Sequence, residues 1–157
     1  MPSITMFGKG TVVEVSTNEY TEVPQDLTNI SDLVDLSCLA TGVNYSGLSV
    51  DEIDVTTLCS LAKEYAAGEL DPGELSFDAH FIPNDSDTYL ALKNASEDRK
   101  KRLWVVTFSN GSKFAVVGYI SNRNWSVPSN SDITTQSVTV KCSGLPVEVL
   151  ASVANNP

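Results

Sequence analysis

Residues 75–81 read Leu75-Ser76-Phe77-Asp78-Ala79-His80-Phe81, a strict alternation of apolar and polar side chains. A period of two is typical of a β-strand that buries one face. The alternation predicts that Leu75, Phe77 and Phe81 point into a core, while the polar side chains point away from it. Pro72-Gly73, just before the stretch, indicates a turn. The chain is therefore expected to be organised around a half-buried strand.

A β-hairpin is predicted further along the chain. Residues 103–108 are apolar on both faces, which is typical of an interior strand. Asn110-Gly111 follows at once, and this dipeptide tolerates the positive φ angles of a tight hairpin turn. Residues 113–120 are the expected return strand. The predicted core residues of the first strand are Trp104, Val106 and Phe108.

The first third of the chain has weaker signals. Residues 11–15 and 20–23 are predicted strands, the second of them ended by Pro24. Residues 28–39 fit either an apolar helix stripe or a strand with a bulge, and we favour the strand. Residues 41–49 hold two glycines and several small polar residues, which indicates a loop.

One helix is expected shortly after the 75–81 strand. Three residues can cap its first amides: Asp85, Ser86 and Asp87. Spacing by three gives it one apolar side, which consists of Tyr89, Leu92 and Ala95. Of these, Leu92 is a predicted core residue. The basic residues 99–102 follow, where positive charge complements the exposed carbonyls at a helix end.

The last part of the chain is expected to hold one more strand. Residues 122–131 are a predicted loop, and residues 135–142 alternate again as a strand that Gly144-Leu145-Pro146 ends. The length suits a single domain over residues 1–157. Residues 1–10 and 147–157 are expected to be flexible arms.

Charge and cysteine content narrow the functional classes. The chain of 157 residues has a formal charge of −10, which argues against a duplex-DNA binder because phosphate contacts need clustered Lys and Arg. The three cysteines are far apart and indicate small apolar residues in a reducing compartment. We find neither a secretory signal pattern nor an apolar run long enough for a bilayer. We therefore expect an intracellular, soluble protein with no membrane partner.

No constellation of residues points to an enzyme. His80 is the single histidine of the chain, so neither a histidine-based metal site nor a Ser-His-Asp triad finds support around it. We interpret His80 as an exposed or interface residue of its strand. Asp85-Ser86-Asp87 lacks the glycine and closing glutamate of a calcium loop, and no glycine-rich phosphate loop occurs. No catalytic residue, metal or cofactor is expected.

Residues 50–74 are predicted to be a long excursion with a short extended piece at 53–57. A floppy insertion is one interpretation. We favour a contact surface, because a disordered loop would not need its large apolar side chains. The candidate contact residues are Ile53, Val55, Thr56, Thr57, Leu58, Leu61, Tyr65, Leu70 and Pro72.

This central segment carries a resemblance to a known family. Its motif consists of Asp54-Val55-Thr56-Thr57-Leu58-Cys59-Ser60, then Lys63-Glu64-Tyr65, then Gly68-Glu69-Leu70-Asp71-Pro72-Gly73-Glu74-Leu75-Ser76-Phe77. The helix, the strand at 104–108, the turn at Gly111-Ser112 and residues 118–121 follow in the family's order. Over residues 11–144, the chain resembles the tail tube proteins of long-tailed, lambda-like bacteriophages.

The resemblance implies a mainly β fold, a β-sandwich or partial barrel completed by oligomerisation, with one flanking α-helix. It also implies hexameric rings that stack into a hollow phage tail tube, through which genomic DNA passes without specific binding. Expected partners are other copies of the chain and the tape measure, tail terminator and tail tip proteins. The expected location is the virion tail, after assembly in the host cytoplasm. Negative charge would keep DNA from adhering to the lumen.

Two alternatives stay open. A monomeric β-sandwich binding module, for host attachment or carbohydrate binding, would use loop aromatics such as Trp125 for its ligand. A related contractile injection system would use the same fold as a tube for protein secretion.

Overall fold

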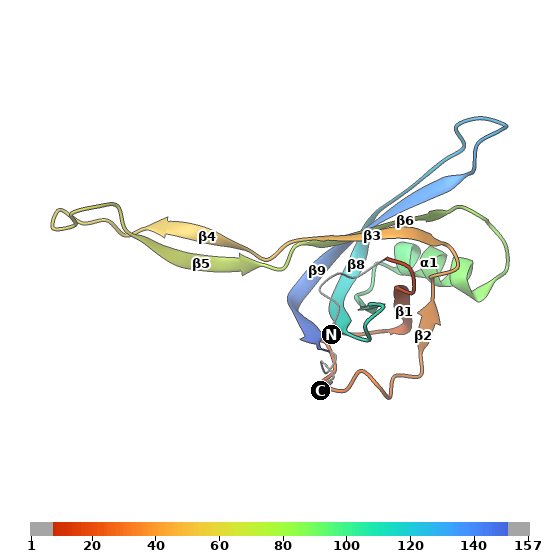
Figure 1. Ribbon diagram of the computed structural model, residues 1–157, viewed down its shortest axis with the longest axis horizontal. Helices are drawn as coiled ribbons and strands as arrows, with labels where there is room; N and C mark the ends of the chain where they lie inside the picture. Colours follow the sequence, from red (N-terminus) through yellow and green to blue (C-terminus); the bar gives the residue numbers. More distant parts are fainter. Residues whose placement is uncertain (1–7, 151–157) are drawn as a thin grey trace, which may run out of the picture.

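Seven strands pair into one bent antiparallel sheet, and two more strands form a separate hairpin that projects from it (Figure 1). The computed structural model describes residues 8–150. Within this range the elements are β1 (Val12–Glu19), β2 (Leu33–Asp35), β3 (Ala40–Ser46), β4 (Ser49–Asp54), β5 (Tyr65–Asp71), β6 (Glu74–His80), α1 (Asp87–Asp98), β7 (Arg102–Thr107), β8 (Lys113–Ser126) and β9 (Thr135–Val149). The predicted fold class, mainly β with one helix, is confirmed.

The large sheet has the strand order β2-β1-β7-β8-β9-β6-β3 and is not closed into a barrel within the described chain. Its two longest strands, β8 and β9, connect the two halves of the sheet. Register shifts interrupt their pairing between Ala115 and Val117 and between Ile120 and Asn122. Such irregularities bend a strand. At Gly118 the two strands approach so closely that a Cβ atom would overlap the backbone of Lys141.

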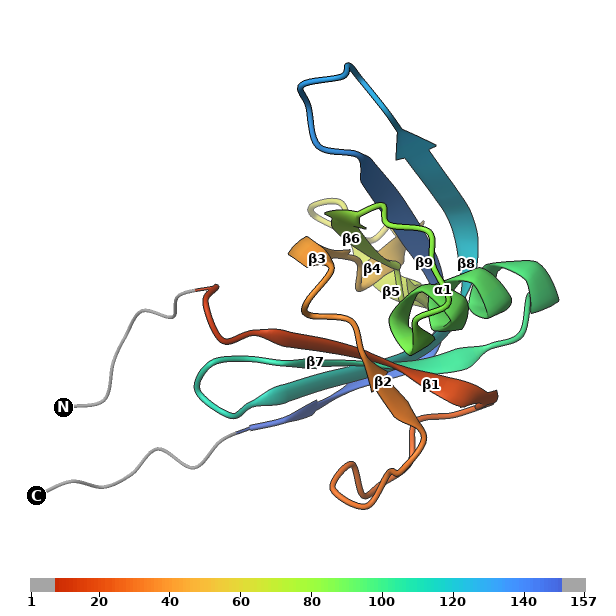
Figure 2. The ribbon, with the colours of Figure 1, turned by 90° about the vertical axis from the view of Figure 1, so that its right-hand side faces the viewer.

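The core lies inside this bend, and α1 covers its open side (Figure 2). Apolar side chains from β1, β6, β7, β8 and β9 meet there, together with Leu92 and its neighbours on the helix. Trp104 is fully buried, packs 5.9 Å from Phe77 between ring centroids, and donates a 3.2 Å hydrogen bond from Nε1 to the carbonyl of Gly118. Such burial of aromatic and branched side chains supplies most of a domain's stability.

Several sequence predictions are confirmed. The strand at 75–81 is β6, whose alternate side chains enter the core. The hairpin predicted around Asn110-Gly111 is β7–β8, and Gly111 has a positive φ of 90°. The helix begins where its caps predict: Ser86 is the N-cap, and its Oγ accepts a hydrogen bond from the amide of Tyr89. The helix ends at Asp98 with Arg99 in the left-handed conformation, and its last turn holds no basic residue.

Other predictions are wrong. Residues 20–23 are irregular, and residues 41–46 belong to strand β3 rather than to a loop. The expected loop at 122–131 begins later, since β8 continues to Ser126. Gly144-Leu145-Pro146 does not end the last strand, which continues to Val149 and pairs there with Lys113. Backbone pairing with a long neighbour holds these polar or glycine-containing residues in the sheet.

The expected arms at 1–10 and 147–157 fall mostly on residues 1–7 and 151–157, which lie outside the described residues. Of the remainder, residues 8–10 form a turn and Val147 to Val149 end β9. Residues 28–39, open between helix and strand in the sequence, contain the three-residue strand β2 in the middle of irregular chain. No helix among residues 8–150 is long and apolar enough to span a membrane.

Candidate functional site

The hairpin of β4 and β5, residues 49–71, projects from the large sheet and is almost entirely exposed to solvent. Every residue of its two strands is exposed except Gly68, which is half-buried. The strands pair only with each other, with Val50 opposite Leu70 and Asp54 opposite Tyr65. Figure 1 shows the hairpin reaching far to one side of the sheet. The excursion predicted at 50–74 is therefore an ordered hairpin with neither face covered.

The tip of this hairpin, residues 55–64, is held by its own polar groups. Thr56 Oγ1 accepts a 2.8 Å hydrogen bond from the amide of Glu64, and Ser60 Oγ accepts one of 3.0 Å from the amide of Thr57. Asp54 Oδ1 accepts a 2.9 Å bond from the amide of Thr56. The hydrogen bonds from Thr56 lower the pKa of Asp54 below its usual range. The threonines thus shape the tip, while Leu58 and Leu61 extend into solvent.

At the base of the hairpin, two chain segments cross at glycines. A Cβ atom on Gly47 would lie 2.6 Å from the Cα atom of Gly73, and Gly73 itself has a φ of 86°. The Tyr45 hydroxyl donates a hydrogen bond to the carbonyl of Pro72 at this crossing. The carbonyl of Gly73 accepts a 3.1 Å bond from the amide of Cys142 on β9. Pro72-Gly73, predicted as a turn, is where the hairpin joins the sheet.

The predicted contact residues therefore fall into three groups. The large apolar side chains are exposed along the hairpin: Ile53, Val55, Leu58, Leu61, Tyr65 and Leu70. The relative exposures of Leu58 and Leu61 are 107% and 106%, as in a chain that touches nothing. Thr56 and Thr57 are exposed but engaged in the tip. Pro72 is half-buried at the base.

The predicted core residues lie as follows. Leu75, Phe77, Leu92, Trp104 and Val106 are buried in the main cluster, and Phe108 packs against it while partly exposed. Phe81 lies outside the core, because β6 ends at His80 and the chain turns away there. Its ring instead takes part in a surface cluster.

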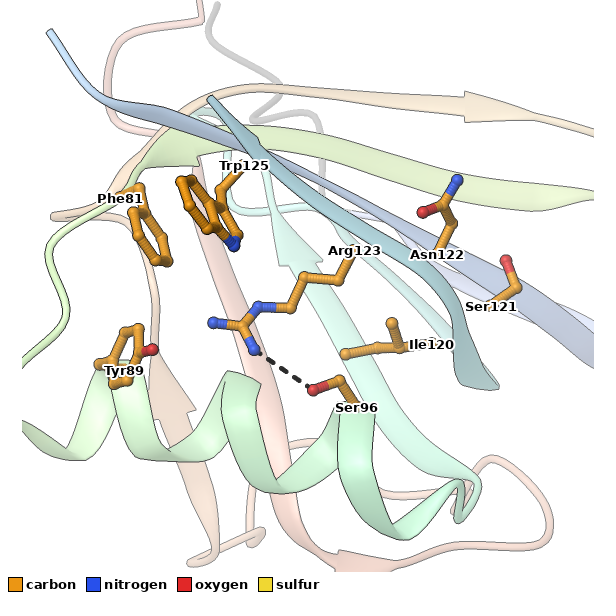
Figure 3. Close-up of a pocket in the computed structure, with 8 residues that line it drawn as sticks. All are labelled: Phe81, Tyr89, Ser96, Ile120, Ser121, Asn122, Arg123 and Trp125. Carbon is orange, nitrogen blue, oxygen red and sulfur yellow. Dashed lines mark hydrogen bonds between the residues drawn. The ribbon is translucent and has the colours of Figure 1, made fainter. Parts of the chain in front are cut away.

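This surface cluster, the aromatic ledge, consists of Phe81, Tyr89, Trp125 and Arg123 (Figure 3). The rings of Phe81 and Trp125 are stacked with centroids 5.2 Å apart and planes 3° from parallel. Tyr89, from α1, meets Phe81 edge-on at 6.1 Å. The guanidinium of Arg123 lies 5.4 Å from the centroid of Tyr89. A polar strip along the ledge is completed by Ser96, Ser121 and Asn122.

Hydrogen bonds fix Arg123 in place. Its Nε donates to Gln136 Oε1 at 3.3 Å, and its Nη1 donates to Ser96 Oγ at 3.4 Å. Trp125 nevertheless keeps a relative exposure of 61%. The prediction that Trp125 lies on a loop is wrong, because it is part of β8. Its place beside Phe81 could not be predicted, because the two residues lie 44 positions apart in sequence.

The large sheet also has two free edges. Among the described residues β3 pairs only with β6, and β2 only with β1. The outer edge of β3 is the longer, running over seven residues. Unpaired edges of this length can add a strand from another chain.

The cysteines and the single histidine are the candidate reactive side chains. Cys38 and Cys59 are exposed, and burial raises the pKa of Cys142 to about 11. His80 is half-buried on β6 and its Nδ1 has no hydrogen-bond partner. Within residues 8–150 no group of three or more His, Cys, Asp or Glu side chains could hold a metal ion.

Comparisons with solved structures find the same fold in several assemblies. A chain in the tail of an empty gene transfer agent (GTA) particle, refined with C6 symmetry, is 15% identical with a TM-score of 0.65, covering 93% of this chain and all of that one. A chain of the PVC sheath–tube complex of an extracellular contractile injection system is 10% identical with a TM-score of 0.68, covering 95% and 94%. The SPP1 tail tube is 12% identical with a TM-score of 0.58, covering 92% and 78%. These likenesses show the fold.

A search of curated proteins finds no match. The profile of one family, described as phage tail tube, TTP, lambda-like, matches residues 11–138. The match spans most of the chain. It includes the β4–β5 hairpin, the four residues of the aromatic ledge and every strand except the last part of β9. The chain therefore belongs to the lambda-like phage tail tube family, whose members are structural proteins of the virion tail.

Proposed function

We propose that six copies of this chain form a ring, and that the rings stack into the tail tube through the β4–β5 hairpin of each subunit. The C6 symmetry of the related GTA tail supports the number of copies. The tape measure, tail terminator and tail tip proteins would be the further partners, and assembly would take place in the host cytoplasm before the tail joins the virion.

The observation that carries this proposal is the exposure of the whole β4–β5 hairpin. An isolated two-stranded hairpin is at best marginally stable in water. This one presents seven large apolar side chains to solvent, the six named above and Val50, with neither face packed on the chain's own core. Burying such side chains is worth about 1.5–3 kcal/mol each. A second copy that covers the hairpin would supply this stabilisation.

The free edges of the large sheet support closure of the ring. β3 lies at one end of the strand order and β2 at the other. A ring in which the edge of one subunit meets its neighbour would cover both without any change of fold. The same head-to-tail relation repeated along an axis gives a tube.

DNA passage is the finer part of the proposal. The chain carries 20 acidic and 10 basic residues. A lumen with net negative potential would repel phosphates and let DNA slide without adhering. A ring structure with a strongly basic bore would contradict this part while leaving the tube itself intact.

The experiment compares two pairs of exposed leucines. Leu58→Ser with Leu61→Ser alters the hairpin tip, whereas Leu145→Ser with Leu150→Ser alters the end of β9, where the leucines have relative exposures of 64% and 76%. Size-exclusion chromatography and negative-stain microscopy of the purified proteins are the measurements.

We expect tubes from the unaltered chain and from the β9 pair, and no tubes from the tip pair, whose thermal unfolding should match the unaltered chain. If the variant with both tip leucines replaced forms tubes and the variant with both β9 leucines replaced does not, the contact between rings lies at the end of β9 and not at the hairpin. A chain that stays monomeric under every condition would overturn the proposed function and favour a binding module.

A further inference from the structure

We propose that the aromatic ledge is the receptor for the hairpin tip of a second copy, so that Leu58 and Leu61 of one subunit lie against Phe81 and Trp125 of the next. This inference rests on the proposed stacking of rings. The ledge would be the surface on the other side of that contact. The exposure of the hairpin alone does not identify this surface.

The two surfaces cannot meet within one copy. The β4–β5 hairpin extends to one side of the sheet, while the distal parts of β8 and β9, which carry Trp125, extend to the other (Figure 1). A contact between them therefore joins different copies, and it is heterologous, because the two surfaces are not the same patch. Repeated contacts of this kind generate an open stack rather than a closed dimer.

The two surfaces also match in chemistry. The tip offers two aliphatic side chains with nothing around them. The ledge offers the exposed face of Trp125, with Ile82 also exposed next to Phe81. Aromatic side chains of this kind are the usual centres of binding energy in interfaces.

Charge favours the same pairing. Residues 49–71 hold six acidic residues and one basic residue, Lys63. The ledge contains Arg123, and the C-terminal end of α1 beside Ser96 continues into Arg99, Lys100 and Lys101. The N-terminal end of the helix is acidic, with Asp85 and Asp87. Attraction would therefore direct the acidic hairpin towards the C-terminal end of the helix.

The ledge is ordered before any partner arrives. Stacking on Phe81 holds Trp125, and hydrogen bonds to Gln136 and Ser96 hold Arg123. Ordered side chains lose little conformational entropy on binding, so the contact keeps more of its interaction energy. The tip is ordered in the same way by its internal hydrogen bonds.

Cross-linking with a short bis-maleimide tests the pairing directly, because Cys59 already lies exposed at the tip. In a Cys38→Ser background, Asn122→Cys places a second thiol at the ledge, and Leu145→Cys places one at the exposed end of β9. The Cys38→Ser chain itself reports any link between two Cys59 residues, since Cys142 is buried.

In assembled tubes we expect ladders of covalently joined subunits from Asn122→Cys, and none from the Cys38→Ser chain or from Leu145→Cys. Tubes in which Leu145→Cys forms the ladder and Asn122→Cys does not would overturn the ledge as receptor, with the tube function untouched. Failure of the unaltered chain to form tubes would overturn the proposed function, and the ledge pairing with it.

A second variant measures the strength of the contact. Trp125→Ala should raise the protein concentration needed for tube growth about tenfold, while single rings remain intact by size-exclusion chromatography. Val127→Ala, at an exposed side chain just after the end of β8, is the matched control and should leave growth unchanged. Equal growth of the Trp125→Ala and unaltered chains would contradict the inference.

Discussion

Two β-hairpins of this chain share antiparallel pairing and have opposite surroundings. In β7–β8, five of the six residues of the first strand are buried, and residues 108–112, which include Asn110-Gly111, join the strands. In β4–β5, every residue of the first strand is exposed, and the turn is a ten-residue tip. Both are antiparallel pairs, and the pairing of β4 with β5 has a register shift between Val50 and Glu52. The comparison teaches that the core of the same chain stabilises one hairpin, whereas the other would be covered only by the second copy proposed above.

The first way to sharpen this comparison is to remove one large side chain from each hairpin. Trp104→Ala should lower the free energy of unfolding by about 3–5 kcal/mol, because it leaves a cavity in the core. It also removes the donor to the carbonyl of Gly118. Leu58→Ala should change it by about 0.5 kcal/mol or less, as at other exposed sites. Urea denaturation of the monomer measures both, and similar losses in the two variants would show that the tip is packed in the monomer.

The second test concerns Gly73, at the base of the hairpin where the two regions join. Gly73→Ala should cost about 2–4 kcal/mol, since its φ is 86° and its Cβ would overlap the backbone of Gly47. Gly144→Ala is the control, because its φ is 80° but its Cβ would meet nothing. That change should cost about 1 kcal/mol for the left-handed backbone alone. Equal shifts in the unfolding temperatures of Gly73→Ala and Gly144→Ala would mean that the two backbone segments at Gly47 and Gly73 move apart at little cost.

The same contrast explains how much of the fold was predictable. β6, β7 and the start of β8 carry apolar side chains at fixed spacing because each contributes one or both faces to a core, and that burial leaves a pattern in the sequence. β3 leaves only a short one: Val43 and Tyr45 pack against the core, but Thr41, Gly42 and Asn44 are exposed, and backbone pairing with β6 runs along the whole strand. Backbone hydrogen bonds are the same for every residue type, so composition alone indicated a loop.

The surfaces proposed for assembly were predictable to a different degree. Large apolar side chains in a polar segment indicated a contact surface at residues 50–74, but nothing in the sequence indicated that this segment is a paired hairpin. The aromatic ledge could not be found in this way. Phe81 continued the alternation of β6 and was expected in the core, although the strand ends one residue earlier. The stacking of Phe81 on Trp125 depends on the bend of β8, and no local pattern in the sequence predicts this bend.

The smallest expected effect concerns the carboxylate of Glu14, on β1 opposite Asp35 of β2. Burial, and then the charge of Asp35, raise the pKa of Glu14 above its usual value. A carboxyl group whose pKa is higher in the folded state favours folding below its unfolded pKa, and that contribution is lost as the pH rises through the folded value. At pH 7 the ionised group therefore destabilises the fold, and Glu14→Gln should raise the free energy of unfolding by roughly 0.5 kcal/mol or less after solvent screening.

The gain from Glu14→Gln should disappear as the pH falls below the ordinary range of a glutamate, because the native side chain is then neutral as well. Glu52→Gln, on the exposed hairpin, is the matched control and should leave thermal unfolding unchanged at both pH values. A gain for Glu14→Gln that persists at low pH would indicate that packing, rather than charge, causes it. Any gain at Glu52 in the monomer would contradict the exposure of this strand to solvent.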